Sequence, residues 1–254
     1  MRLDKALTLA GITRSEAKAM IARGRVRVGD AVTRSAGLDV RPEDVIVDGA
    51  PLDAEPEVYL MLNKPAGVVT ATEDKHLPTV VSLLPERYQR RRIGPVGRLD
   101  RDVTGLVLLT TDGQLAHRLI SPRWKAEKRY RAVCEGTLTE ADVRAFAEGV
   151  QLTDFTARPA GMAIIEAGET STADVTLTEG KFHQVKRMFI AIGHPLLSLR
   201  RLQIGCVELD GHLAPGEFRK LTDAEIEGLK AATGLMEGGA IASTSESKLE
   251  ICRA

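Results

Sequence analysis

The chain has few cysteines, and none of them is spaced as part of a metal site or a redox pair. Its three cysteines, Cys134, Cys206 and Cys252, lie far apart and form no CxxC motif. An odd and scattered set of this kind argues against a disulfide framework and against a zinc site. The five histidines show no metal-ligand spacing either, so we expect no bound metal.

Long apolar runs are also missing. No segment approaches the roughly 18 consecutive apolar residues that a membrane-spanning helix requires. The N-terminus has neither the apolar core nor the cleavage site of a signal peptide. Hydrophobic residues make up 43% and charged residues 28% of the chain, as in ordinary globular proteins. We therefore expect a cytoplasmic protein that makes no contact with a membrane.

The common phosphate-binding and nucleophile motifs are absent. The chain contains no Gly-Lys-Ser/Thr phosphate loop, no GxGxxG turn and no GxSxG elbow. These motifs carry the phosphate-binding loops and the serine nucleophiles of large enzyme classes. Their absence removes the commonest nucleotide-binding and hydrolase interpretations.

The net charge is zero, but the charged residues are unevenly distributed. Residues 1–34 contain eight Arg or Lys against three Asp or Glu, and residues 86–131 contain twelve against five. Residues 180–203 contain no acidic residue, whereas residues 223–250 contain six acidic residues against two lysines. Three basic blocks suit a nucleic-acid partner, although each block alone is also typical of a solvated surface.

Residues 1–48 are predicted to form a small domain of two helices and a hairpin. The segment from Thr13 to Glu16 has the pattern of a capping box, which starts the second helix, and Gly24 would end it. Gly29 and Asp30 predict a two-residue turn of type II′ between two short strands. The polar positions on the second helix and the first strand are nearly all basic, which predicts a face for RNA phosphates formed by Arg14, Lys18, Arg23, Arg25 and Arg27.

A polar linker is expected at 49–57, followed by an α+β domain at 58–232. Strand patterns occur at 58–62, 67–72, 106–110, 129–134, 163–165, 173–178 and 196–199, and helix patterns at 114–121, 140–148, 183–192 and 223–231. Strands outnumber helices and rarely alternate with them one for one. This order favours a mixed, largely antiparallel sheet with helices packed on it over a doubly wound fold. Residues 233–254 are predicted to be a disordered tail.

The most informative segment, GRLDRDVTGLVLLTTDG at 97–113, places an aspartate just before a buried strand. Asp100 lies between Arg98 and Arg101, whose guanidinium groups would favour the ionised carboxylate that a nucleophile needs. A rigid strand can aim such a side chain into a cleft. The same residues could instead form a surface network of salt bridges.

Asp102 leaves a second interpretation open. On an extended segment its side chain would point to the same side as that of Asp100, about 6.5 to 7 Å away. Two carboxylates at such a separation admit a glycosidase mechanism. The segment shows no apolar surroundings that would keep Asp102 protonated, which counts against that mechanism.

Three further segments combine cations with groups that suit RNA. In 128–133 (KRYRAV), Lys128 and Tyr130 share one face of a strand, so the ring could stack on a base, although it could equally be a core aromatic. The turn and helix at 179–188 bring His183 close to three other polar side chains. In the third segment, a pair of arginines follows the strand at 196–199. The candidate contacts are Gln184, Lys186, Arg187, Arg200 and Arg201.

These motifs together resemble a known family. The segment at 12–30 resembles the αL RNA-binding motif of small-subunit ribosomal protein four. The segments MLNKPAGVVTATED, GRLDRDVTGLVLLTTDGQLAHRL, KRYRAV, EGKFHQVKRMFIAIG and LRRLQIG follow in the order found in bacterial rRNA pseudouridine synthases. The resemblance covers roughly residues 1–230. HLPTVVSLL and LAPGEFRKLTDAEI are most similar to the small-subunit (16S) branch, although large-subunit (23S) relatives share most motifs.

The resemblance implies the roles of four residues. It makes Asp100 the nucleophile, Tyr130 the ring against the target base, Lys186 the cationic partner of Asp100, and Leu199 an apolar wall beneath the uracil. Arg200 stands where close relatives commonly have histidine.

The implied reaction converts a uridine of ribosomal RNA to pseudouridine. The base detaches, turns and rejoins the ribose through C5, without a cofactor. Asp100 could attack C1′ or remove the C2′ proton, and the sequence does not distinguish the two. We expect a monomer that acts on ribosomal RNA or on a ribosomal-subunit assembly intermediate. A non-catalytic rRNA-binding or ribosome-assembly factor with the same fold is the alternative from another class.

Overall fold

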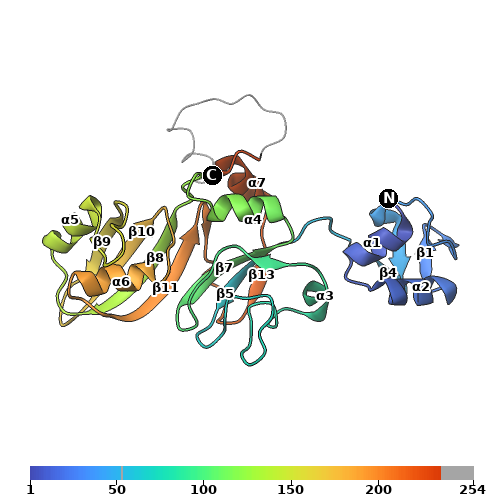
Figure 1. The fold of residues 1–254 in the computed structure, drawn as a ribbon. Coiled ribbons are helices and arrows are strands. Elements are labelled where there is room, and N and C mark those ends of the chain that lie inside the picture. The colour runs from blue at the N-terminus through green and yellow to red at the C-terminus, as the bar shows by residue number, and fades with distance from the viewer. Residues whose placement is uncertain (53, 236–254) are drawn as a thin grey trace.

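In the computed structural model, which describes residues 1–52 and 54–235, the N-terminal segment folds as two helices on a small sheet (Figure 1). The predicted capping box is present, because Thr13 Oγ1 accepts a hydrogen bond from the backbone N–H of Glu16 and the Glu16 carboxylate binds the N–H of Thr13. Leu3, Leu7 and Ile21 are buried between the helices and the sheet. The elements are α1 (Leu3–Leu9), α2 (Arg14–Ala22), β1 (Val26–Val28), β2 (Ala31–Val32), a 3-10 turn η1 (Pro42–Asp44), β3 (Val45–Val47) and β4 (Ala50–Pro51).

This sheet has four strands in the order β2-β1-β3-β4, whereas the sequence predicted only the first hairpin. The missed signal is Asp48-Gly49, whose φ angles of 52° and 85° form a type I′ turn between β3 and β4. Two residues of the predicted linker at 49–57, Ala50 and Pro51, therefore pair as β4.

The second domain is built on one long mixed sheet, as the sequence predicted. The strand order is β13-β5-β7-β11-β8-β10-β9; β7 and β11 are parallel, and all other strand pairs of this sheet are antiparallel. The elements are β5 (Tyr59–Lys64), α3 (Glu86–Gln89), β6 (Gly94–Pro95), β7 (Thr104–Thr110), α4 (Gly113–Ile120), β8 (Lys128–Glu135), α5 (Glu140–Glu148), β9 (Gly161–Glu166), β10 (Thr170–Leu177), α6 (Gln184–Ala191), β11 (Leu196–Ile204), β12 (Val207–Glu208), β13 (Phe218–Lys220) and α7 (Asp223–Ala232). The predicted tail at 233–254 lies, from residue 236 onward, outside the described residues.

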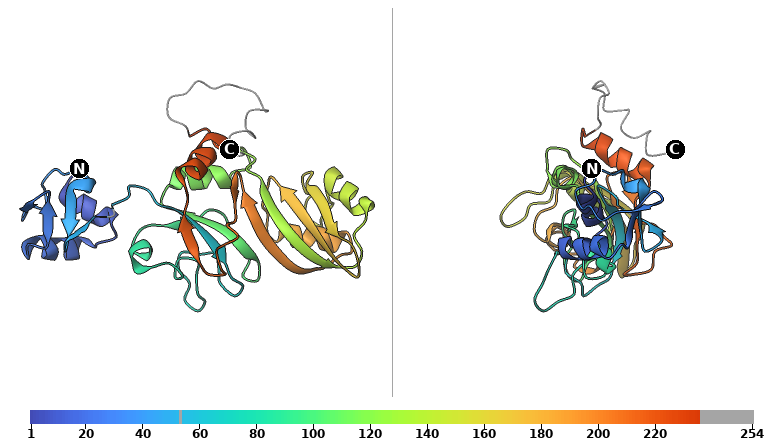
Figure 2. Two further views of the ribbon diagram at one scale, coloured as in Figure 1. Left: turned by 180° about the vertical axis from the view of Figure 1, so that it is seen from behind. Right: turned by 90° about the vertical axis from the view of Figure 1, so that its right-hand side faces the viewer.

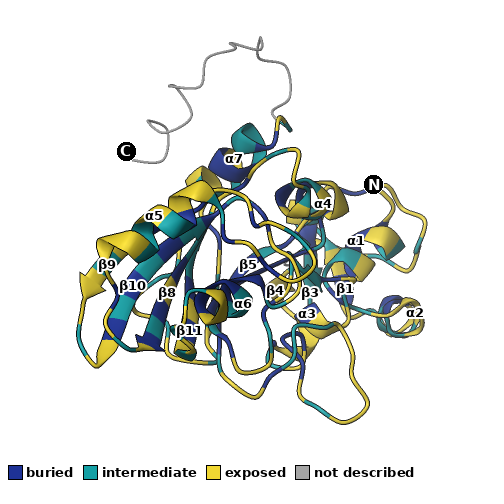
Figure 3. Cartoon of the chain, turned by 60° about the vertical axis from the view of Figure 1, so that its left-hand side comes forward, coloured by how far each residue is buried: buried dark blue, intermediate teal, exposed yellow. Residues whose placement is uncertain are grey.

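Helices cover both faces of this sheet, but over different strands. On one face, α5 packs on β9 and α6 on β11, and Phe146 and Phe189 join the apolar core beside β8 and β10. On the other face, α4 and α7 pack on β5 and β7 through Leu115 and Leu229. On the first face, Val107 and Leu109 of β7 share a core with Val68 and Val80 from the loop before α3. The strand β7 is therefore buried on both sides, which explains its uninterrupted apolar sequence. Figure 3 shows the buried strands between helices whose outer faces are exposed.

The prediction of a strand at 67–72 is wrong. This segment is a loop with a single bridge between Val69 and Thr79. Its polar groups bind the loop that carries Asp100: the N–H of Gly67 donates to the carbonyl of Arg101, and Thr70 Oγ1 donates to the carbonyl of Leu99. The apolar and β-branched residues of 67–72 favour a strand, but this pattern does not show that the backbone of the segment bonds to a loop and not to a neighbouring strand.

Gly105 marks the closest approach between β7 and β11. Its φ is 98°, and a Cβ atom there would lie 2.2 Å from the carbonyl oxygen of Arg201. We expect Gly105→Ala to lower the free energy of unfolding by at least about 3 kcal/mol, because the strands must separate and the backbone is strained. Urea unfolding followed by circular dichroism measures this. Gly113→Ala is the matched control, since nothing lies within 4 Å of its Cβ position; equal stability of the two variants would refute the close approach.

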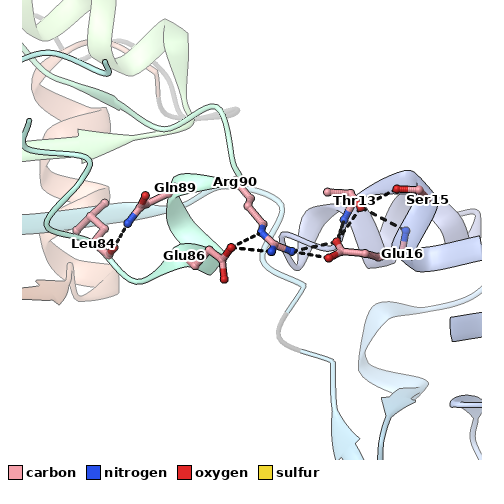
Figure 4. A network of polar contacts seen from close by, with 7 residues as sticks. All are labelled: Thr13, Ser15, Glu16, Leu84, Glu86, Gln89 and Arg90. Carbon is pink, nitrogen blue, oxygen red and sulfur yellow. Dashed lines mark hydrogen bonds and ion pairs between the residues drawn. The ribbon is translucent and has the colours of Figure 1, made fainter. Parts of the chain in front are cut away.

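The N-terminal domain lies at the end of the molecule opposite α5 and α6 (Figures 1 and 2) and contacts α3. Arg90, which follows α3, donates through Nη1 to both carboxylate oxygens of Glu16 at 2.9 Å and through Nη2 to Glu86 at 2.7 Å (Figure 4). A Cβ atom on Gly11 would lie 2.6 Å from the carbonyl oxygen of Arg87. Exposed ion pairs add little stability, but this pair ties the capping box of α2 to the second domain and so orients the basic helix.

Candidate active site

A pocket of about 540 Å³ lies where the two apolar cores of the second domain meet. Its walls come from the loop before β7, the end of α4, the strands β8 and β11, and the start of α6. The pocket brings together four residues that are distant in sequence: Asp100, Tyr130, Lys186 and Leu199.

The polar partners of Asp100 come from the start of α6 and not from its neighbours in sequence. Lys186 Nζ lies 3.1 Å from Asp100 Oδ2, and His183 Nε2 lies 3.4 Å from Oδ1. Arg98 is exposed at the rim of the pocket and Arg101 is exposed outside it; neither forms an ion pair with Asp100 among the described residues. The expectation that flanking guanidinium groups hold this carboxylate is therefore wrong, because the fold places an ammonium group closer.

Lys186 is shared between two carboxylates. Its Nζ donates to Oδ1 of Asp102 at 2.7 Å and to Oδ2 at 2.9 Å, and it also forms the ion pair with Asp100. Burial opposes its charge, but the hydrogen bonds to Asp102 and Asp100 prevail, so the pKa of Lys186 is raised. The hydrogen bond from Lys186 in turn lowers the pKa of Asp102.

These contacts count against the glycosidase alternative. The Asp102 side chain is 73% exposed, does not line the pocket and is held ionised by Lys186. A glycosidase needs a protonated carboxyl group beside its substrate, with a raised pKa. Asp102 has neither the position nor the protonation state for that role.

The turn before α6 is held by its own polar groups. Gln184 accepts a hydrogen bond from the N–H of Lys181 and donates to the buried Glu179 carboxylate at 2.6 Å. His183 adopts the left-handed conformation, with φ 50° and ψ 30°, and stacks on Phe182 with a ring separation of 3.9 Å. Left-handed backbone in a non-glycine residue is uncommon, and here it is what turns the imidazole toward Asp100.

The strands β8 and β11 supply the sheet wall of the pocket. Tyr130 and Leu199 line the pocket and are each 8% exposed. Lys128 on β8 and Arg201 on β11 also line it, because each lies two residues from Tyr130 or Leu199 and therefore on the same face of its strand. Arg200 points to the other face and is exposed outside the pocket. Arg187 also lies outside the pocket, where it pairs with Asp154 and contacts the ring of Phe155.

Sequence reasoning missed Lys64, which holds the Asp100 loop in place. It is fully buried, and its Nζ donates to the carbonyls of Val103 at 2.7 Å, Pro65 at 3.0 Å and Arg101 at 3.1 Å. Burial lowers the pKa of Lys64 to about 8. The available signal was a lysine at the end of an apolar strand pattern, since lysine is seldom fully buried without partners.

The predicted basic residues of the N-terminal domain are all exposed and do not line the pocket. Arg25 pairs with Asp48, and Arg27 donates to the carbonyl of Asp30 at 2.8 Å. The side chains of Lys18, Arg23 and Arg14 form no hydrogen bond or ion pair with another described residue. The domain therefore presents a basic surface separate from the pocket.

Comparison with known proteins agrees with this description. Residues 58–191 match the family described as RNA pseudouridylate synthase, and residues 1–46 match the S4 domain. The chain is 43% identical over 233 residues to the ribosomal small subunit pseudouridine synthase A of Escherichia coli, covering 89% of this chain and 98% of that protein. It is 40% identical over 233 residues to an uncharacterized RNA pseudouridine synthase of Aquifex aeolicus, covering 91% and 96%.

A solved structure agrees as well. The crystal structure of a pseudouridylate synthase matches with a TM-score of 0.65 at 36% identity, covering 90% of this chain and 99% of that one. The fold and the site define a class of protein in which an RNA-binding S4 domain precedes a synthase domain, and in which an aspartate lines the pocket of the synthase domain. The chain belongs to the RNA pseudouridylate synthase family and is thus an isomerase. Of the helices in the described part, none has the length and apolarity needed to cross a membrane.

Proposed function

We propose that this enzyme converts a specific uridine of small-subunit (16S) ribosomal RNA to pseudouridine, with Asp100 as the nucleophile. The observation that carries the proposal is the position of Asp100: an aspartate held between Lys186 and His183 at the wall of a pocket whose volume suits a nucleoside. The choice of small-subunit RNA rests on the printed name of the Escherichia coli relative, which is similar over nearly its whole length.

In the proposed reaction the bond between N1 of uracil and C1′ of ribose breaks, and a bond between C5 and C1′ forms. The proton on C5 leaves and N1 gains one, so the product is an isomer and no cofactor is required. Asp100 begins the reaction either by attacking C1′ or by removing the C2′ proton. Lys186 keeps Asp100 in place, while Tyr130 and Leu199 provide flat and apolar surfaces against which the detached uracil can turn.

The uridine must leave its helix to enter the pocket, which costs a few kcal/mol. We propose that contacts to phosphates offset this cost. The exposed residues of the N-terminal domain, Arg14, Lys18, Arg23, Arg25 and Arg27, would bind RNA at a distance from the target. Arg98, Lys128, Arg200 and Arg201 would bind it near the pocket, whereas Gln184 and Arg187 would act through the turn and the loop that they hold.

Ribosomal RNA, free or in a subunit assembly intermediate, is the partner that this proposal requires. In an assembly intermediate, a uridine that the finished subunit would enclose can still leave its RNA helix and enter the pocket. We propose that the enzyme acts there as a monomer, in the cytoplasm, where the subunits are built.

Mapping pseudouridines in the ribosomal RNA of cells with and without the protein tests the function. We expect one pseudouridine of small-subunit RNA, detected by primer extension after carbodiimide treatment, to disappear without the protein and to return with the wild-type chain. Loss of a pseudouridine from large-subunit RNA instead would establish the 23S alternative. An unchanged set of pseudouridines, together with rRNA binding, would establish the non-catalytic assembly factor.

A further inference from the structure

The pocket contains positive charge that its carboxylates do not balance. Lys186 is occupied by Asp100 and Asp102, and the buried Glu179 is engaged by Gln184 and by the N–H of Arg158. The remaining buried or half-buried cations of the pocket are Lys128 and Arg201. Within the described residues neither forms an ion pair with any carboxylate.

Arg201 carries the clearest sign of a missing ligand. The residue is 3% exposed, and its Nε donates to the carbonyl of Leu106 at 2.8 Å. Its second terminal nitrogen, Nη2, is buried and has no hydrogen-bond partner among the described residues. A buried unpartnered nitrogen on a charged group is costly, and in a working pocket it indicates a group that arrives with the substrate.

Lys128 adds a second charge on the same wall. It donates to the carbonyls of Ala126 at 2.7 Å and Leu119 at 3.4 Å, which leaves its charge uncompensated. Burial, and then the neighbouring charge of Arg201, lower the pKa of Lys128 to about 8. An anion bound between the two cations would favour the charged form of Lys128 and so offset both the burial and the repulsion by Arg201.

The strand register places these cations around the ring of Tyr130. Arg201 on β11 lies opposite Tyr130 on β8, and Ile204 lies opposite Lys128. Lys128 and Tyr130 are two residues apart on one strand and therefore point to the same face. A base lying against Tyr130 would then have a cation on each of two sides of the ring.

We propose that Arg201 and Lys128 form an anion subsite that binds a phosphate of the target nucleotide. The proposal deepens the proposed function, since it assumes that a nucleotide occupies the pocket. A guanidinium fork suits the tetrahedral oxygens of a phosphodiester, and an ammonium group adds a point charge beside it. The contact stabilises the everted nucleotide and is a binding contact, separate from the bond-breaking role of Asp100.

Small nucleotides test the subsite without any knowledge of the natural RNA. Uridine, uridine 5′-monophosphate and uridine 3′-monophosphate are titrated into the full-length protein. Affinity is measured by isothermal titration calorimetry in the wild type and in every variant, and in the wild type the ¹⁵N–¹H resonance of Arg201 Nε is also followed by NMR. This resonance is assigned by its loss in Arg201→Lys. We expect at least one monophosphate to bind about tenfold tighter than uridine, the size of effect that a charge-assisted hydrogen bond provides.

The variants decide which residues provide this advantage. Lys128→Met and Arg201→Met should each reduce the preference for the monophosphate to less than about threefold. Arg131→Met is the matched control, because Arg131 follows Tyr130 on β8 but is exposed and paired with Asp174; it should keep the full preference. If circular dichroism shows that Arg201→Met does not fold, Lys128→Met alone decides.

Equal binding of uridine and both monophosphates to the wild type would overturn the subsite, as would a preference that survives both substitutions. Failure to bind any of the three at millimolar concentration would overturn it too. These outcomes differ from a failure of the proposed function, which shows only in the rRNA map. A protein that prefers the monophosphate but leaves rRNA pseudouridines unchanged would retain the subsite and lose the rRNA target.

Discussion

Replacing Asp100 by asparagine is expected to reduce pseudouridine formation by at least about 10⁴-fold, the order seen when an enzyme loses its nucleophile. Asparagine has nearly the same size as aspartate, so the pocket keeps its shape, but its amide can neither attack C1′ nor remove a proton. Tritium released from [5-³H]uridine-labelled small-subunit rRNA under single-turnover conditions measures the loss. RNA affinity should stay within a fewfold, because the basic surface is unchanged.

Asp102→Asn is the matched control for this substitution. Asp102 shares Lys186 with Asp100 but lies outside the pocket, so we expect a loss of no more than about tenfold, arising from a less restrained Lys186. Full activity of Asp100→Asn would end the proposed mechanism. Equal and severe losses in both variants would revive the two-carboxylate alternative.

Replacing Lys64 by methionine is the second large effect that we expect. Methionine fills nearly the same volume but removes the Lys64 donor from the carbonyls of Pro65 and Val103, and leaves that of Arg101 with the N–H of Gly67. The free energy of unfolding should fall by about 3 kcal/mol or more, because each buried unsatisfied carbonyl costs about 1–3 kcal/mol. The carbonyls of Arg101 and Val103 belong to the loop that carries Asp100, so catalysis should also fall by about 10- to 100-fold.

Chemical unfolding and single-turnover rates together test this role. Lys75→Met is the control, because Lys75 is exposed in a loop, and neither stability nor rate should change. A Lys64→Met variant with wild-type stability and rate would show that the three hydrogen bonds do not hold the loop.

The pH dependence of stability gives an independent test of Lys64. Its pKa is about 8 in the folded protein, against 10.5 for the free side chain. Between these pH values the unfolded chain holds more protons than the folded chain, so this group makes the free energy of unfolding rise with pH. The penalty for burying the charge is fully present below pH 8 and disappears above about pH 10.5. Lys64→Met should flatten the rise, and the part that remains should come largely from Lys128, whose pKa is lowered in the same way.

The sequence by itself determined those parts of the protein that depend on short-range interactions. Capping boxes at Thr13 and Thr222 mark the starts of α2 and α7, and α5 spans the predicted residues up to its stop at Gly149. Strand patterns located β5, β7, β8, β9, β10 and the start of β11, which was enough for a mixed, largely antiparallel α+β fold. Such signals succeed because caps, turns and alternating burial involve residues only a few positions apart.

Only the tertiary structure decided how the chemistry is assembled. The partners of Asp100 lie more than 80 residues away on α6, and the donor that holds its loop, Lys64, comes from another strand. Of two adjacent arginines, the strand pleat buries Arg201 in the pocket and exposes Arg200. The segment at 67–72 bonds to the loop before β7 instead of forming a strand. These outcomes depend on which segments the two cores bring together, and local sequence patterns contain no information on contacts between residues distant in the chain.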